Sequence, residues 1–258
     1  MKHLAAVIIV AATTLCGCGV KSTEDSQTNQ LLLYCGAGLR PPVNELVETF
    51  ERLHGVKIIT DYAGSEVLLA KIKLARRGDL YMPGDEYYIE QAAGKKMILS
   101  QKTVCYFVPA ILVQKGNPKN IRSLQDLLQG SLKIGLGYPN VCAVGRKTLE
   151  IFAKNNIDWD TIQKNVSFLS PTVNELGMQI QARSLDAVIV WDAVARYYAN
   201  YGDQIPIPAE NNCVSTVDVG VLTFTKNRSL AEKFVEFAAS EQGQAIFKKH
   251  LYRVEIPK

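Results

Sequence analysis

The chain has 258 residues, of which 47% are hydrophobic and 21% are charged, and its formal net charge is +4. A chain of this length and composition buries a sizeable core and forms one or two domains. The charge is modest and the sequence has no dense basic run, so nucleic acid is not the expected partner.

The N-terminus carries an export signal. A short basic start (MKH) precedes a mostly apolar stretch over residues 4–15, whose length is typical of a signal peptide and short for a membrane span. The stretch ends in LCGC (15–18), which resembles a bacterial lipobox and implies cleavage before Cys18 and lipidation of its thiol. A secretory signal without lipid is the alternative. Residues 1–17 are therefore predicted to be a signal peptide and residues 18–30 a polar, lipid-anchored tether, which places the protein in the periplasm or at the cell surface.

Four cysteines remain after the predicted cleavage and lipidation. Export permits disulfide bonds, and four thiols allow three pairings, between which the sequence does not choose. All four can equally be buried free thiols, so their oxidation state stays open. They are Cys35, Cys105, Cys142 and Cys213.

Strand and helix signals alternate along the rest of the chain. Strand-like stretches lie at residues 31–35, 56–62, 79–82, 104–114, 132–137, 166–169, 187–191 and 217–225. Helical patterns lie at residues 43–53, 65–75, 86–93, 124–128, 142–154, 172–182, 192–201 and 230–249, the last interrupted near Gly243. This alternation predicts βαβ units and mainly parallel sheets flanked by helices.

Two segments predict a division into lobes. Residues 104–114 form a β-rich run, broken by Pro109, that is long enough to leave one lobe and enter another. Residues 217–225 would return, and the last helices would pack on the first lobe. The predicted fold is therefore α/β with two lobes, residues 31–106 plus 217–258 and residues 107–216, and a ligand cleft between them.

Four strand-to-helix turns are rich in small residues. They are GAG (36–38), AGS (63–65), YPNVCAVG (138–145) and SPT (170–172). In a parallel sheet such turns lie at the carboxyl ends of the strands, where open α/β sheets bind ligands. Each turn also places a helix N-terminus there, with free N–H groups and a positive dipole end. One such turn is weak evidence, but four together indicate a small anion held without charged side chains, with Ser65 and Thr172 as further donors.

Several stretches resemble the periplasmic molybdate-binding proteins, the substrate-binding components of molybdate ABC transporters. They are YCGAGL (34–39), DYAGSEVLLAKI (61–72), GDLYMPGD (78–85), GLGYPNVCAVGR (135–146) and LAEKFVEFAASEQGQAIFKKH (230–250). The resemblance covers most of residues 31–254 and implies a type II periplasmic-binding fold. It implies a tetrahedral oxyanion, molybdate or tungstate, held by neutral donors between closing lobes. It also implies a transporter permease in the inner membrane as partner, and a monomer that needs no cofactor and performs no catalysis.

The ligand contacts of that family imply a set of binding residues in this chain. Its first contact, a serine in the first turn, corresponds to Gly38, where only a backbone N–H can serve. Its second serine corresponds to Ser65. Its tyrosine, which follows an apolar strand, corresponds to Trp191, so an indole would replace a hydroxyl. The other implied ligand-binding residues are Ala37, Gly64, Ala143 and Val173.

Two arginines are further candidates for contact with the ligand. Arg40 follows the first turn, and Arg146 lies in the first helical turn after Cys142. The planar guanidinium group suits bidentate contacts with an oxyanion. The alternative is that both point outward, to solvent or to Glu45 and Glu150.

A thiol-dependent enzyme is one rival interpretation. Cys142 lies at a predicted helix N-terminus, which favours the thiolate and its reactivity. Its neighbourhood, CAVGRK, lacks the expected phosphatase pattern of a cysteine followed by five residues and an arginine, and no histidine is an evident general base. We therefore do not expect an enzyme, although Cys142 stays a candidate ligand contact.

A metal-cation site is the second rival. Carboxylates and tyrosines can bind ferric iron, and the thiols of Cys35 and Cys142 can bind softer metals. These carboxylates and tyrosines lie in residues 78–88 (GDLYMPGDEYY). That stretch also fits a strand, a Pro-Gly turn and a helix start at which acidic residues favour the dipole. The candidate ligands are Asp79, Tyr81, Met82, Asp85, Glu86, Tyr87 and Tyr88.

Overall fold

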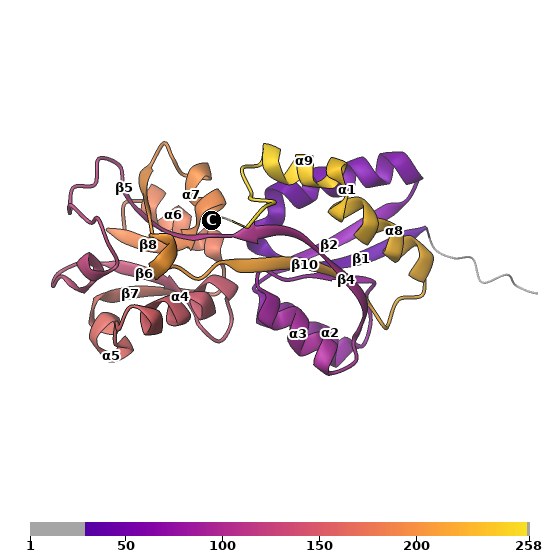
Figure 1. Cartoon of the computed structure of the whole chain (residues 1–258), viewed down its shortest axis with the longest axis horizontal. Coiled ribbons are helices and arrows are strands. Elements are labelled where there is room, and N and C mark those ends of the chain that lie inside the picture. Colours follow the sequence, from indigo (N-terminus) through magenta and orange to yellow (C-terminus); the bar gives the residue numbers. More distant parts are fainter. Residues whose placement is uncertain (1–28, 257–258) are drawn as a thin grey trace, which may run out of the picture.

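The computed structural model describes residues 29–256, so the predicted signal peptide, Cys18 and most of the predicted tether lie outside the described residues. The described residues form two lobes that lie side by side, each a five-stranded sheet with helices on both faces (Figure 1). This is the two-lobed α/β fold predicted from the sequence. None of the described helices is long and apolar enough to cross a membrane.

The first lobe is built on a sheet with the strand order β2-β1-β3-β10-β4. Its strands are β1 (Gln30–Gly36), β2 (Lys57–Ala63), β3 (Leu80–Met82), β4 (Ile98–Phe107) and β10 (Ser215–Leu222). Its helices are the short η1 (Ala37–Leu39), α1 (Arg40–His54), α2 (Ser65–Ala75), α3 (Glu86–Gly94), α8 (Arg228–Ala239) and α9 (Glu241–Lys249). In Figure 1, α1, α8 and α9 lie on one side of this sheet, and α2 and α3 lie on the other.

The second lobe is built on a sheet with the strand order β7-β6-β8-β5-β9. Its strands are β5 (Pro109–Gln114), β6 (Ile134–Gly137), β7 (Val166–Ser170), β8 (Ala187–Trp191) and β9 (Gly202–Pro206). Its helices are η2 (Gln125–Leu128), α4 (Ala143–Lys154), α5 (Trp159–Ile162), η3 (Gln163–Asn165), α6 (Val173–Gln181), α7 (Asp192–Tyr197) and η4 (Ala209–Asn211). Every residue of the central strand β8 is buried, as expected for a strand that is covered on both faces.

Each sheet is mixed, whereas the sequence predicts mainly parallel sheets. β1 pairs in parallel with β2 and β3, and β6 pairs in parallel with β7 and β8. By contrast, β10 is antiparallel to β3 and β4, and β5 is antiparallel to β8 and β9. The strands β4, β5 and β10 adjoin the segments that cross between the lobes, so they are not joined to their neighbours by the helical crossovers that parallel pairs require.

The chain crosses between the lobes at Val108 and again between β9 and β10. The run 104–114 thus divides into β4 of the first sheet and β5 of the second. Phe107 and Ser215 pair with each other in the first sheet. The lobe boundaries given above stay a prediction, since sheet pairing alone does not define them.

Local sequence sets the ends of the helices. Pro41 and Pro42 occupy the first turn of α1, where their missing N–H groups cost no hydrogen bond. Asp85 caps α3 through its side chain. Ser240 caps α9 in the same way, by accepting a hydrogen bond from the N–H of Gly243. The C-terminal helical region therefore breaks at Ser240, close to the interruption predicted near Gly243.

Candidate functional site

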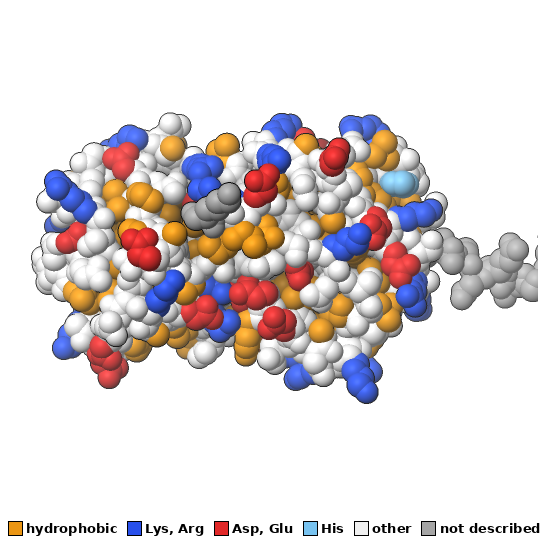
Figure 2. Space-filling model, in the orientation of Figure 1, with side chains coloured by type: hydrophobic (Ala, Val, Ile, Leu, Met, Phe, Trp, Pro, Cys, Tyr) orange, Lys and Arg blue, Asp and Glu red, His pale blue; other side chains and the backbone are white. Residues whose placement is uncertain are grey.

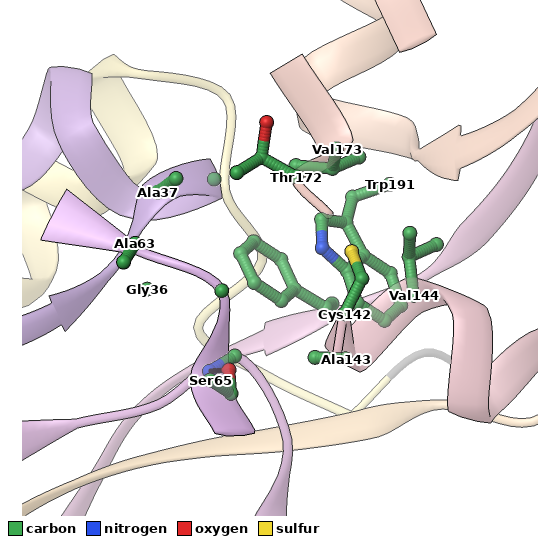
Figure 3. Close-up of a pocket in the computed structure, with 14 residues that line it drawn as sticks. Gly36, Ala37, Ala63, Ser65, Cys142, Ala143, Val144, Thr172, Val173 and Trp191 are labelled. Atoms are coloured by element: carbon green, nitrogen blue, oxygen red, sulfur yellow. Dashed lines mark hydrogen bonds between the residues drawn. The ribbon is translucent and has the colours of Figure 1, made fainter. Parts of the chain in front are cut away.

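A small cavity of about 20 Å³ lies between the two lobes (Figure 3). This volume slightly exceeds what one water molecule requires, so a ligand enclosed here is small. The lining residues come from the ends of β1, β2, β4 and β8, from the turn after β3 and from the starts of η1, α2, α4 and α6. The lining residues are Gly36, Ala37, Gly38, Ala63, Gly64, Ser65, Gly84, Phe107, Cys142, Ala143, Val144, Thr172, Val173 and Trp191.

Three α-helices begin at the cavity. Ser65 is the first residue of α2 in the first lobe, and Ala143 and Val173 are the first residues of α4 and α6 in the second. The N–H groups of a first helical turn have no partner within their own helix, and the helix dipole gives that end a partial positive charge. The convergence of the turns predicted from the sequence is therefore present, and it offers backbone donors from both lobes.

Two nearly buried side chains add donors to the cavity. Ser65 is 2% exposed, and its Oγ accepts a hydrogen bond of 3.1 Å from the N–H of Gly84, which leaves the hydroxyl proton free to donate. Trp191 is also 2% exposed, and its ring stacks on Phe107 with centroids 4.6 Å apart. Within residues 29–256 its indole nitrogen has no hydrogen-bond partner, and the nitrogen is not among the atoms shut off from solvent.

All the lining residues within the described chain are uncharged. Arg40, a sequence candidate, is exposed and lies over the ring of Tyr62, 4.1 Å from its centroid. Arg146 lies over the ring of Tyr87 at 4.0 Å and pairs with Glu150 at 2.7 Å. The structure thus places both guanidinium groups outside the cavity lining, because aromatic and acidic partners hold them elsewhere.

The other residues predicted to contact the oxyanion all line the cavity, together with residues that were not predicted to do so. Gly84 follows β3, and its amide holds Ser65. Phe107 ends β4 at the crossing between the lobes and supports Trp191. The Pro-Gly turn at residues 83–84 was a usable signal for Gly84, whereas a phenylalanine in an apolar strand gives no sign that it faces a ligand.

Backbone atoms of the two lobes touch beside the cavity. A side chain at Gly64 would put its Cβ 2.7 Å from the carbonyl oxygen of Pro171 and 2.8 Å from that of Val141. The amide of Asn174 donates a hydrogen bond of 3.0 Å to the carbonyl of Ala37 in the other lobe. The structure therefore represents the closed arrangement of the lobes.

Charged residues join the lobes on one side of the cavity. Lys147 of α4 is 3% exposed, and its Nζ lies 3.1 Å from Asp85 Oδ2 and 2.9 Å from Glu86 Oε1 in the first lobe. It also lies 3.0 Å from Glu150 Oε2 of its own helix. Burial lowers the pKa of Lys147, but the surrounding carboxylates outweigh it and raise that pKa. In Figure 2, acidic and basic side chains gather over the boundary between the lobes.

The acidic residues that were candidate metal ligands have other partners in the structure. Asp85 and Glu86 bind Lys147, while Asp79 accepts hydrogen bonds from the N–H of Leu32 and the hydroxyl of Thr225. Within residues 29–256, no group of three or more His, Cys, Asp or Glu side chains is placed to hold a metal ion.

Cys142 lines the cavity as the N-cap of α4, and burial raises the pKa of its thiol to about 11. The helix N-terminus opposes this shift but does not reverse it. The described cysteines are Cys35, Cys105, Cys142 and Cys213, all of them free thiols.

Alkylation should therefore distinguish an inert thiol at Cys142 from a reactive one. At neutral pH we expect iodoacetamide to modify the partly exposed Cys213 before the buried Cys142, because the thiolate is the reactive species and Cys142 stays protonated. The rate at Cys142 should rise as the pH approaches the pKa of its thiol. Peptide mapping by mass spectrometry measures both rates, and faster modification of Cys142 than of Cys213 at neutral pH would revive the thiol-enzyme interpretation.

Two lobes closed over a small uncharged cavity define the class of this protein: it is a binding protein that encloses its ligand between lobes. Residues 31–253 match the family described as bacterial extracellular solute-binding protein, and the chain belongs to this family.

The curated relatives of the chain are distant in sequence but match over nearly their full length. A Haemophilus influenzae protein, named only as a binding protein, is 26% identical over 239 residues, covering 93% of this chain and 95% of the relative. The molybdate-binding protein ModA of Mycobacterium tuberculosis is 22% identical over 249 residues, covering 94% and 93%. These relatives are named as binding proteins and not as enzymes, which supports a role in binding.

Solved structures show the same fold. The periplasmic molybdate-binding protein of Azotobacter vinelandii superposes with a TM-score of 0.75 at 16% identity, covering 88% of this chain and all of that one. Other structures of this fold are named for sulfate, fructose-6-phosphate or iron. The fold alone therefore does not define the ligand, which depends on the groups that line the cavity.

Proposed function

We propose that this protein is the extracytoplasmic substrate-binding component of an ABC importer and that it binds a small tetrahedral oxyanion, molybdate or tungstate. The observation that carries the proposal is the convergence of three α-helix N-termini, the Ser65 hydroxyl and the Trp191 indole on one uncharged cavity. Its lobes would close over the anion and present the closed form to a membrane permease.

The energetics favour an anion in this cavity. A dianion that leaves water loses strong solvation, which has to be replaced by hydrogen bonds. Each helix N-terminus supplies oriented N–H donors and about half a positive charge. Hydrogen bonds to a charged acceptor are about twice as strong as those between neutral groups. A site of this kind needs no arginine or lysine in contact with the ligand.

The chemistry of the lining also favours a fully deprotonated anion. Phosphate and arsenate carry a proton at neutral pH and need an acceptor for it. No carboxylate, the strongest acceptor for such a proton, lines the cavity among the described residues. Molybdate, tungstate and sulfate carry no such proton. Among these three anions, the fit between the size of the ion and the size of the cavity would determine which binds most tightly.

The relatives and the sequence extend the proposal beyond the cavity. The ModA relatives favour molybdate over sulfate. The N-terminal pattern favours a signal peptide over residues 1–17, lipidation of Cys18 and a tether to the outer face of the membrane. Division near Val108 and before Ser215 would let the lobes open and close. The proposed contacts are Ala37, Gly38, Gly64, Ser65, Ala143, Val173 and Trp191, with the thiol of Cys142 beside them.

Calorimetric titration of the purified protein with a panel of ligands tests this function. The panel is molybdate, tungstate, sulfate, phosphate, arsenate, ferric citrate and zinc, and we expect one site for molybdate or tungstate with much weaker binding of phosphate. Ser65→Ala should weaken that binding by about 10-fold or more, since it removes a hydrogen bond to a charged ligand. Ser100→Ala, at an exposed serine, is the matched control. Heat only with ferric citrate or zinc would overturn the proposal.

A further inference from the structure

Gly38 and Trp191 belong to different lobes and meet at the cavity. A Cβ at Gly38 would lie 2.8 Å from Val173 Cγ1, 3.3 Å from Trp191 Cδ1 and 3.5 Å from Trp191 Nε1. Val173 and Trp191 therefore occupy the space that a side chain at position 38 would need, and the indole nitrogen lies at the edge of that space. Figure 3 shows the Trp191 nitrogen facing the middle of the lining residues.

The indole ring is fixed in this place. Trp191 pairs with Pro109 at the end of β8, and the N–H of the next residue, Asp192, donates a hydrogen bond of 2.7 Å to the carbonyl of Val108. Its ring lies nearly parallel to that of Phe107, with an interplanar angle of 9°. A ring held on its face and through its backbone cannot turn its N–H toward another partner.

The peptide of Gly38 is fixed as well. Its carbonyl accepts a hydrogen bond from the hydroxyl of Tyr252, whose ring lies 5.5 Å from that of Phe107. Phe107 and Tyr252 thus hold Trp191 of the second lobe and Gly38 of the first lobe in place. Position 38 cannot retreat from Trp191 without breaking the bond to Tyr252.

We infer that Gly38 and Trp191 act as a coupled specificity pair, in which the absent side chain at position 38 admits the indole and the indole N–H is a direct donor to the bound oxyanion. This inference rests on the proposed function. The indole N–H faces the cavity and has no acceptor among residues 29–256, so it is available to donate to a ligand there. The rigid ring also limits the width of the cavity on this side, so the pair helps to set the size of anion that fits.

Nuclear magnetic resonance of the indole N–H tests the contact directly in the unmodified protein. The chain has two tryptophans, so two indole signals are expected, and Trp159→Phe identifies the one that belongs to Trp191. On addition of molybdate or tungstate, the Trp191 proton signal should move downfield because its N–H becomes a donor to a charged acceptor. The Trp159 signal should stay in place.

A double-mutant cycle tests the coupling. Trp191→Phe keeps an aromatic ring on Phe107 but removes the donor, so affinity should fall about 10- to 100-fold, the effect of one hydrogen bond to a charged group. Gly38→Ser should also weaken binding, because its side chain meets Val173 and Trp191. In the combined variant the smaller ring leaves room for the serine hydroxyl, so the loss should be clearly less than the two single losses together. Gly94→Ser, where no atom lies within 4 Å of an added Cβ, is the matched control.

The outcomes separate this inference from the proposed function. If the unmodified protein binds no oxyanion, the proposed function fails and the inference fails with it. If it binds one while the Trp191 signal does not move, or while Trp191→Phe binds with unchanged affinity, the inference alone is overturned. A cycle in which the two single losses simply add would overturn the coupling.

Discussion

Replacing Gly64 with alanine is expected to weaken oxyanion binding by roughly 100-fold, with little change in the thermal stability of the unliganded protein. The backbone at Gly64 has φ of −63° and ψ of 146°, which any residue adopts, so the effect comes from space alone. The added Cβ would lie 2.7 Å from the carbonyl oxygen of Pro171 and 2.8 Å from that of Val141, both in the other lobe. Backbone atoms cannot move aside as a flexible side chain can, and overpacking of this kind costs up to about 3 kcal/mol. The cost arises when the lobes close, so it is seen in the dissociation constant.

Calorimetric titration and thermal melting of the same preparation separate closure from folding for this variant. Gly94→Ala is the matched control, since Gly94 is exposed and an added Cβ meets no atom within 4 Å. If Gly64→Ala binds as tightly as the unmodified protein, the closed arrangement of the lobes is not the form that holds the ligand. An equal loss in both variants would point to a general effect of glycine replacement.

Replacing Lys147 with methionine is expected to weaken oxyanion binding by a similar or greater factor. Methionine has nearly the length of lysine but leaves Asp85, which is 0% exposed, without its ammonium partner in the closed form. Removing one partner of a buried ion pair costs about 3–5 kcal/mol. Arg146, whose Nε lies 3.6 Å from Asp85 Oδ1, offsets only part of this cost because it has no direct hydrogen bond to that carboxylate. That cost corresponds to a loss of affinity of at least about 100-fold if it falls on closure.

The pH dependence of the Lys147→Met variant follows from Asp85. Burial raises the pKa of this carboxyl, and the charge of Lys147 opposes the rise. Without the lysine the pKa is raised further, so protonation of Asp85 becomes favourable in the closed form. Protonated Asp85 needs no cation, and the deficit of the variant should shrink as the pH falls.

Two further variants test this explanation. Asp85→Asn in the Lys147→Met background removes the stranded charge and should recover part of the affinity. Lys102→Met is the matched control, since Lys102 pairs with Glu236 on the exposed surface and such pairs contribute about 0–1 kcal/mol. An unchanged dissociation constant and melting temperature for Lys147→Met would contradict the role of the network in closure.

Sequence reasoning predicted the features of this molecule that depend on local patterns. Small residues after strands mark the turns at residues 36–38 and 63–65, and such turns can be recognised from the local sequence alone. The same reasoning led to Ser65, because a helix start is a local signal, whereas Ala143 was implied by the resemblance to the molybdate-binding family. The alternation of strands and helices likewise gave the two-lobed α/β fold.

The features that sequence reasoning did not give depend on contacts between distant segments. β9 (Gly202–Pro206) contains a glycine and a proline and lies at the edge of its sheet, so its strand character comes from pairing with β5. Arg146 was a candidate ligand contact because of its place near a helix start, but its direction is set by Tyr87 and Glu150. The pairing of Lys147 with Asp85 and Glu86 joins segments about sixty residues apart and has no periodic signal.

The most direct test of the central claim is the anomalous difference map of crystals grown with tungstate, recorded at a tungsten absorption edge. We predict one strong peak in the cavity between the lobes, with anion oxygens at hydrogen-bonding distance from the backbone nitrogens of Ser65, Ala143 and Val173. A cavity without such a peak, or a peak held by charged side chains elsewhere on the protein, would contradict the account.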